Sequence, residues 1–85
     1  MIKPSVNSEK DYSFVSPEHI RAARGWLHWN LNKTQEMSNL DRMTISRFEL
    51  GKQNIANATR GILFEMFLRE GIELRPDGLR ARKSQ

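Results

Sequence analysis

Two arginines stand in the stretch DRMTISRFELGK, which covers residues 41–52. If this stretch is helical, Ile45 and Phe48 lie three residues apart on one face. The side chains that then point outward, on the opposite face, are Arg42, Met43, Ser46 and Arg47. An arginine can bind O6 and N7 of guanine with two hydrogen bonds, and a methionine can contact the methyl group of thymine. These four side chains are candidates for reading base edges in DNA, and a solvated polar face is the alternative.

Polar residues on both sides of this stretch could bind phosphate groups. Amides, hydroxyls and lysines that contact phosphates set the position of a protein on a duplex without reading its sequence. The candidates are Asn30, Asn32, Lys33, Thr44, Lys52, Gln53 and Asn54. The same residue types are typical of a solvated surface, and that interpretation stays open here.

The chain has few residues suited to catalysis or metal binding. His19 and His28 are nine positions apart, which is not the spacing of two metal ligands on one helix face. There are no cysteines, so disulfides and thiolate metal sites are excluded. We find no glycine-rich phosphate loop, nucleophile elbow or paired carboxylates. The sequence therefore predicts a protein that is not an enzyme and has no metal or other cofactor.

Charge and length narrow the class of protein further. The 85 residues include 14 Lys and Arg against 10 Asp and Glu, which gives a net charge of +4. A positive excess favours polyanions, because neutralised phosphates release condensed counterions. A chain of this length forms one small domain. The opening residues MIKPSVNSEKDYSF contain no apolar stretch typical of a signal peptide or a membrane span, so we expect a soluble, cytoplasmic protein.

The start of the fold is marked by helix signals. Residues 1–13 are mostly polar, and we expect them to form a flexible N-terminal arm. Ser16 is a good N-cap and Pro17 suits the first helical position, so a helix begins here. Its inward stripe is Ile20, Ala23 and Leu27. Trp26 and Trp29 flank that stripe and are expected in the core or at its rim.

Two shorter helices are expected next. Asn30 can cap a second helix over residues 31–38, although its apolar stripe is weak. Asp41 is an N-cap candidate and Gly51 a helix stop, so residues 41–50 are expected to form a third helix. A strand is the alternative for residues 41–50, because apolar and polar residues alternate at their start.

The last part of the chain changes from helical to strand periodicity. Asn57 is expected to cap the longest helix, over residues 58–70, with Gly71 as its stop. After it, apolar and charged residues alternate on both sides of the turn sequence RPDG at 75–78. The pattern predicts a β-hairpin that packs on the long helix or pairs with a second subunit.

Four short helices thus precede a small hairpin, and a tight turn joins the second helix to an arginine-bearing third helix. This arrangement is a DNA-binding helix-turn-helix. The sequence TISRFELG at 44–51 resembles the signature of Cro/repressor-type (XRE-family) transcriptional regulators. The resemblance extends over residues 16–82. It implies a mostly α, four-to-five-helix lambda-repressor-like domain over residues 14–71 and a C-terminal β-hairpin with a basic tail over 72–85.

The resemblance also implies roles for individual residues. An arginine of the first helix pairs with the glutamate of the third helix in this family, and Arg24 and Glu49 hold those places. The family's glutamine at the start of the second helix is replaced by Leu31. A second alignment, which deletes about one helical turn, puts Thr34 and Gln35 on the family's Thr/Ser-Gln pair; we prefer the gapless one.

As a function, the resemblance implies a sequence-specific double-stranded DNA-binding regulator, bacterial or phage in origin and associated with the nucleoid. It would act as a homodimeric autorepressor on a palindromic operator, with helix 41–50 in the major groove and the last helix and the hairpin as the dimer surface. The alternative is an antitoxin or antiactivator that binds another protein. The irregular second helix favours that alternative, as do Phe64 and Leu68, which we expect to be exposed.

Overall fold

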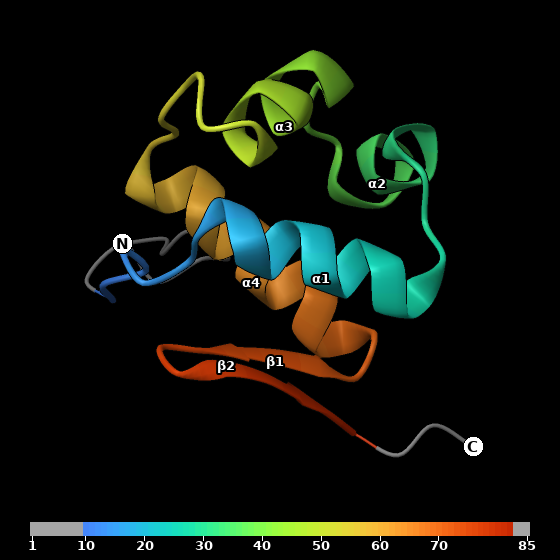
Figure 1. Ribbon diagram of the computed structural model, residues 1–85, viewed down its shortest axis with the longest axis vertical. Coiled ribbons are helices and arrows are strands. Elements are labelled where there is room, and N and C mark those ends of the chain that lie inside the picture. Colours follow the sequence, from blue (N-terminus) through green and yellow to red (C-terminus); the bar gives the residue numbers. More distant parts are fainter. Residues whose placement is uncertain (1–9, 83–85) are drawn as a thin grey trace, which may run out of the picture.

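The computed structural model describes residues 10–82 of the chain. Its elements follow in the order α1 (Pro17–Leu27), α2 (Leu31–Ser38), α3 (Arg42–Glu49), α4 (Asn57–Arg69), β1 (Ile72–Arg75) and β2 (Gly78–Ala81). With the longest axis vertical, α3 lies at one end, α1 and α4 cross the middle, and the hairpin forms the opposite end (Figure 1). The predicted mostly α fold with a C-terminal hairpin is confirmed, and residues 42–49 are helix rather than strand.

Side chains cap the N-termini of the first two helices. Ser16 accepts a hydrogen bond from the His19 backbone N–H, and His19 Nδ1 accepts one from the Ser16 backbone N–H, so the two residues form a reciprocal cap. Asn30 caps α2 by accepting from the backbone N–H of Lys33 at 2.8 Å. Asn39 ends α2 in the left-handed conformation, with φ of 63°, which asparagine tolerates better than most residues.

The prediction that Asn57 caps the last helix is wrong. Asn57 is itself the first residue of α4, and the N-cap position is held by Ala56, whose side chain makes no cap hydrogen bond. The Asn57 side chain instead accepts from the Tyr12 backbone N–H at 2.7 Å and donates to the Lys10 carbonyl at 2.9 Å. These two bonds dock the segment before α1 onto the start of α4.

The predicted N-terminal arm is wrong for its last residues. Residues 1–9 lie outside the described part of the chain, but Tyr12 is only 2% exposed and belongs to the core. Its ring lies 5.3 Å from the ring of Phe64, and Phe14 meets Phe64 edge-on at 5.9 Å. Phe64 is therefore covered by the chain's own N-terminal segment, and the expectation that it is exposed is also wrong.

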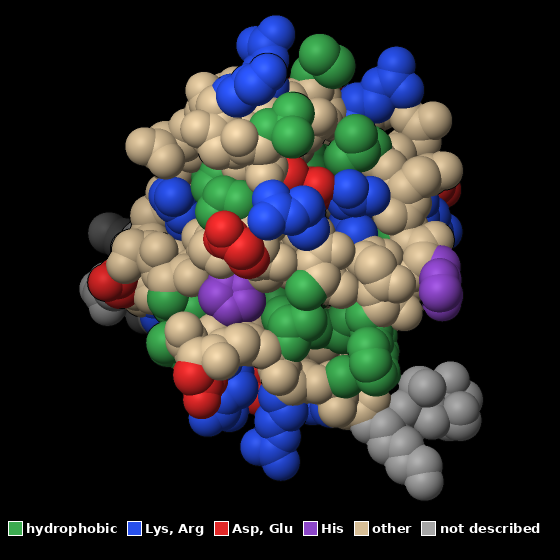
Figure 2. All heavy atoms as spheres, viewed as in Figure 1, with side chains coloured by type: hydrophobic (Ala, Val, Ile, Leu, Met, Phe, Trp, Pro, Cys, Tyr) green, Lys and Arg blue, Asp and Glu red, His purple; other side chains and the backbone are tan. Residues whose placement is uncertain are grey.

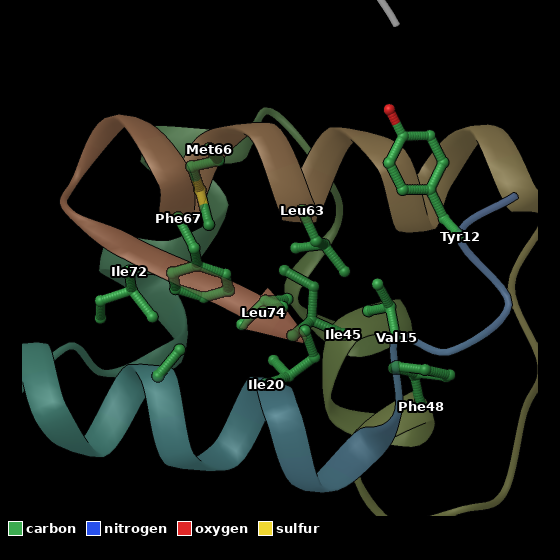
Figure 3. Close-up of a cluster of buried hydrophobic side chains, with 11 residues drawn as sticks. Tyr12, Val15, Ile20, Ile45, Phe48, Leu63, Met66, Phe67, Ile72 and Leu74 are labelled. Carbon is green, nitrogen blue, oxygen red and sulfur yellow. The ribbon is translucent and has the colours of Figure 1, made fainter. Parts of the chain in front are cut away.

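Buried apolar side chains from α1, α3, α4 and β1 meet in one core, together with Tyr12 and Val15 (Figure 3). The members are Tyr12, Val15, Ile20, Ala23, Ile45, Phe48, Leu63, Met66, Phe67, Ile72 and Leu74. Trp29 packs at its rim, with its ring 6.0 Å from that of Phe67. Trp26 differs from the expectation, because 62% of it is exposed.

The hairpin lies under two different helices. α4 packs on β1, whereas α1 packs on β2. The register pairs Leu74 with Leu79 and Ile72 with Ala81, and directly opposed residues point to the same face of a sheet. These four residues therefore form the inner face. Within the described chain, no helix is long and apolar enough to cross a membrane, and no group of acidic or histidine side chains could hold a metal ion.

Candidate nucleic-acid interface

The outer face of α3 points away from the core. Ile45 and Phe48 are buried beneath the helix, while Arg42 and Arg47 are exposed. Met43 is 52% exposed, although its side chain is apolar. Ser46 lies between them and is half-buried. The four predicted base-contacting side chains thus share one side of the helix, on the face away from the core.

Leu50 adds a residue that the sequence analysis missed. It follows the last turn of α3 and is 63% exposed. Positions 43 and 50 are two helical turns apart, so the apolar character of the outer face extends along the whole helix. The sequence could have predicted this position, because Arg47 follows Met43 by four residues and Leu50 follows Arg47 by three.

The start of α3 is held by two side chains. Asp41 accepts from the backbone N–H groups of Met43 and Thr44 at 3.0 and 3.2 Å. Gln35, from the middle of α2, accepts from the Arg42 backbone N–H at 2.8 Å. Gln35 is the residue that the second alignment puts on the family's glutamine, and here it supports the third helix from the second. Both contacts satisfy backbone donors that a helix leaves unpaired at its N-terminus.

The end of α3 is held by arginines from α1. Arg24 Nε and Nη2 donate to the two carboxylate oxygens of Glu49 at 2.7 and 2.8 Å, which is a bidentate ion pair. Glu49 is only 5% exposed. The hydrogen bonds to Glu49 raise the pKa of Arg24 above its already high ordinary value. Arg24 also donates to the Trp29 carbonyl at 2.9 Å, and Arg21 donates to the Glu49 carbonyl.

A hollow separates the starts of α2 and α3. It is lined by Arg24, Asn30, Leu31, Asn32, Arg42, Met43 and Ser46. Across it, Arg42 Nη1 donates to Asn32 Oδ1 at 2.5 Å. The structure therefore brings two predicted phosphate ligands, Asn30 and Asn32, next to three of the predicted base-contacting residues. Lys33 is exposed on α2 but does not line this hollow, and Thr44 is half-buried in the first turn of α3.

The loop after α3 forms a second hollow, on the other side of the helix. Its lining is Pro17, Phe48, Gly51, Lys52, Gln53, Asn54 and Arg60. Arg60 fixes this loop, because it donates to the carbonyls of Val15 and Ile55 at 3.1 and 2.5 Å. Its guanidinium lies 5.2 Å from the centre of the Phe48 ring. The predicted phosphate ligands Lys52, Gln53 and Asn54 are exposed there and stay apart from Asn30 and Asn32.

Basic side chains occupy both ends of the long axis in the view of Figure 2, and one group of them surrounds α3. Asp41 is the acidic residue at the start of α3, and its carboxylate is occupied by the helix N-terminus.

Comparison of the chain with protein-family models, curated protein sequences and solved structures finds no match.

Proposed function

We propose that this protein is a sequence-specific double-stranded DNA-binding transcriptional regulator that places α3 in the major groove. The observation that carries the proposal is the free outer face of α3, with Arg42, Met43 and Arg47 exposed on a helix that is fixed at both ends. The major groove of B-DNA is wide enough for one α-helix and presents a distinct pattern for each base pair. A helix of this family type, the Cro/repressor helix-turn-helix, reads that pattern.

Arg47 and Arg42 have different roles in this proposal. Arg47 makes no ion pair within residues 10–82, so its guanidinium is available for a guanine edge. Arg42 is held by Asn32 across the hollow, which directs it toward the start of α2. A phosphate bound at the N-terminus of α2 would lie near Arg42, since free backbone N–H groups there attract anions. Arg42 then contributes affinity as much as sequence discrimination.

Two copies are proposed to bind a palindromic operator. Half-sites on one face of DNA lie about 34–36 Å apart. The molecule measures 38 × 31 × 26 Å, so two copies with their long axes directed at the DNA fit side by side on adjacent turns. The hairpin lies at the far end of the long axis from α3, which argues against the hairpin as the contact between such copies (Figure 1). A side of the molecule nearer the DNA suits that contact better.

The decisive experiment is an electrophoretic mobility shift with the DNA upstream of the protein's own gene, because small regulators of this type often repress themselves. Arg47→Ala should weaken binding by about 1–3 kcal/mol and relax discrimination at one base pair. Lys33→Ala should weaken binding to all sequences and reduce the salt dependence by about one unit of slope. Arg80→Ala is the matched control, because it removes the same charge at the hairpin end.

A different result would favour the alternative function, binding to another protein. A chain that binds no DNA in this assay at low salt, yet forms a tight complex with another protein through α3, would be an antitoxin or antiactivator. The exposed apolar side chains of Met43 and Leu50 are the specific observation in favour of that second function. The covered position of Phe64 removes one of the reasons the sequence offered for it.

A further inference from the structure

A partly exposed apolar surface lies between α1 and the hairpin. Ala22 and Leu79 line one hollow between α1 and the hairpin, and Trp26 lies one helical turn beyond Ala22 on the same side of α1. Ala81 lies two residues beyond Leu79 on the same face of β2. Figure 2 shows apolar side chains gathered between α1 and the hairpin. We call this surface, formed by Ala22, Trp26, Leu79 and Ala81, the Trp26 surface.

The Trp26 surface borders an unpaired strand edge. β2 is the second strand of a two-stranded sheet and pairs on one side only, with β1. The Arg82 backbone N–H donates to the Gly71 carbonyl, so residue 82 bonds toward β1. Because the bonding direction alternates along an antiparallel strand, Arg80 also bonds toward β1. The backbone groups of Leu79 and Ala81 therefore point outward, away from β1, at an edge that can accept another strand.

The two faces of this edge differ in chemistry. On the inner face, an added strand would meet Trp26, Leu79 and Ala81. On the outer face it would meet Arg80 and Arg82, which alternate with the inner residues. Neither arginine has an ion-pair partner within the described residues, whereas Arg75 nearby is paired with Glu73 and Asp77 at 3.6 and 3.7 Å. The available charge on the outer face is therefore positive.

We propose that β2 and the Trp26 surface bind an extended, acidic segment of another protein, in which apolar and acidic residues alternate. The segment adds a third strand to the hairpin through the backbone of Leu79 and Ala81. Its apolar residues cover the Trp26 surface, and its acidic residues meet Arg80 and Arg82. A second copy of this chain fits the edge less well, because pairing two β2 strands would place the arginines of both copies on neighbouring strands.

The proposal can be tested on the full chain with a synthetic peptide in which valine and glutamate alternate over about six residues, the length of a typical strand. The exposed Trp26 reports binding, because its fluorescence emission should shift to the blue when it is covered. A saturable shift that Trp26→Phe abolishes is expected. A peptide in which lysine replaces each glutamate should bind at least about tenfold more weakly, as loss of a charge-assisted contact predicts.

Two variants separate strand addition from nonspecific attraction. Ala81→Pro removes one outward N–H while it leaves the bonds to β1 intact, and proline is tolerated at such edge positions. It should weaken binding of the valine–glutamate peptide by about tenfold, the effect of one lost hydrogen bond. Arg80→Glu should weaken binding of the same peptide and strengthen binding of the lysine peptide. Thermal melts of both variants verify that the hairpin still folds.

Several results would overturn the proposal. Equal binding of the glutamate and lysine peptides would show that charge on the outer face plays no part. Unchanged binding to Ala81→Pro would exclude the strand edge. Sedimentation that shows a dimer which Ala81→Pro dissociates would assign the edge to a second copy of the chain. None of these results depends on whether α3 binds DNA, so failure here leaves the proposed DNA-binding function untouched.

Discussion

At the α3 end, a helix is fixed by polar side chains from its neighbours, whereas at the hairpin end a strand is fixed by buried apolar ones. Arg24 from α1 and Gln35 from α2 hold the two ends of α3, with Asp41 as its N-cap, and Ile45 and Phe48 anchor it to the core. β1 buries the same number of apolar residues, Ile72 and Leu74, in an element half as long, with 4 residues against 8 in α3. Directional bonds fix the orientation of a helix more closely than apolar burial does, because burial is not directional.

This difference suits what each end is proposed to do. A helix that enters the major groove must present its side chains at defined positions, and contacts of hydrogen-bond length at both ends provide that. The hairpin needs only to keep its edge in place. Within residues 10–82, one side chain from outside the hairpin makes directional contacts with it: His19 Nε2 lies 2.6 and 3.1 Å from the carbonyl oxygens of Arg75 and Gly78.

Removal of Glu49 should have the largest effect. Glu49→Ala leaves the Arg24 guanidinium partly buried without its partner, and breaking such a pair costs about 3–5 kcal/mol. Because the Arg24 side chain is 21% exposed, we expect the lower part of that range. Urea denaturation measures the loss. The affinity for operator DNA should fall as well, since α3 loses its support at the C-terminal end.

Glu18→Ala is the matched control for Glu49→Ala. Glu18 is exposed and lies 3.8 Å from Arg21, so solvent screens this ion pair and its loss should change the stability little. If Glu49→Ala leaves the melting temperature unchanged, the polar support of α3 is not what stabilises it. The contrast between the two ends would then disappear.

The next effect is expected at the hairpin end. A carbonyl only accepts, so Nε2 of His19 carries the proton and Nδ1 accepts from the Ser16 backbone N–H. His19→Ala removes the hydrogen bond that Nε2 donates to the hairpin and the one that Nδ1 accepts from Ser16. The loss of these two bonds should cost about 2 kcal/mol. Hydrogen exchange should show faster opening of the hairpin amides, while the amides of α3 stay protected.

His28→Asn serves as the comparison for His19→Ala. His28 is exposed and has φ of 58°, a conformation that asparagine adopts readily. Stability should change little. If His19→Ala speeds exchange equally in α3 and in the hairpin, the two ends are one cooperative unit and not separately held.

A smaller effect is expected from Gln35→Ala. It removes the single bond from α2 to the Arg42 backbone N–H, worth about 1 kcal/mol. The operator affinity should fall more than the stability does, because the start of α3 carries the proposed base contacts. Glu36→Ala, exposed on the same helix, should change neither quantity. Equal effects of the two variants would show that Gln35 does not position α3.

How much of this could be read from the sequence differs between the two ends. The caps Ser16, Asn30 and Asp41 are local signals, because the capping side chain lies within three residues of the backbone group it binds. The hairpin turn is equally local. The structure also joins Arg24 to Glu49, the pair that the family resemblance implies. The caps and the turn follow from short stretches of residues, whereas the Arg24–Glu49 pair, 25 positions apart, follows only from the resemblance.

Contacts between distant segments could not be read in the same way. Asn57 has the residue type of an N-cap, but it binds the segment at Lys10 and Tyr12, far away in the sequence. Tyr12 stands in a polar stretch with no periodicity, so nothing local marks it as buried. Trp26 was expected in the core or at its rim because it flanks the apolar stripe of α1, yet 62% of it is exposed, while Ile20 and Ala23 of the same helix are buried. Tertiary position decides such residues.

Tyr12 gives the smallest predicted effect, and it tests the packing of the N-terminal segment on α4. Its hydroxyl is buried without a hydrogen-bond partner among the described residues, so Tyr12→Phe should be neutral or stabilise the protein by up to about 1 kcal/mol. Burial, helped by the charge of Glu65, raises the pKa of Tyr12 above the ordinary 10.0. The unfolded chain therefore ionises first as the pH rises.

The sign of the pH dependence follows from that order. The contribution of the raised Tyr12 pKa to the free energy of unfolding is fully present below pH 10.0 and is lost as the pH rises through the higher folded-state pKa. Wild-type protein should therefore lose stability above this pH more steeply than Tyr12→Phe. Because the chain contains one tyrosine, phenolate absorbance follows this group alone. If that absorbance titrates at the ordinary pKa in the folded protein, Tyr12 is open to water and the N-terminal segment does not belong to the core.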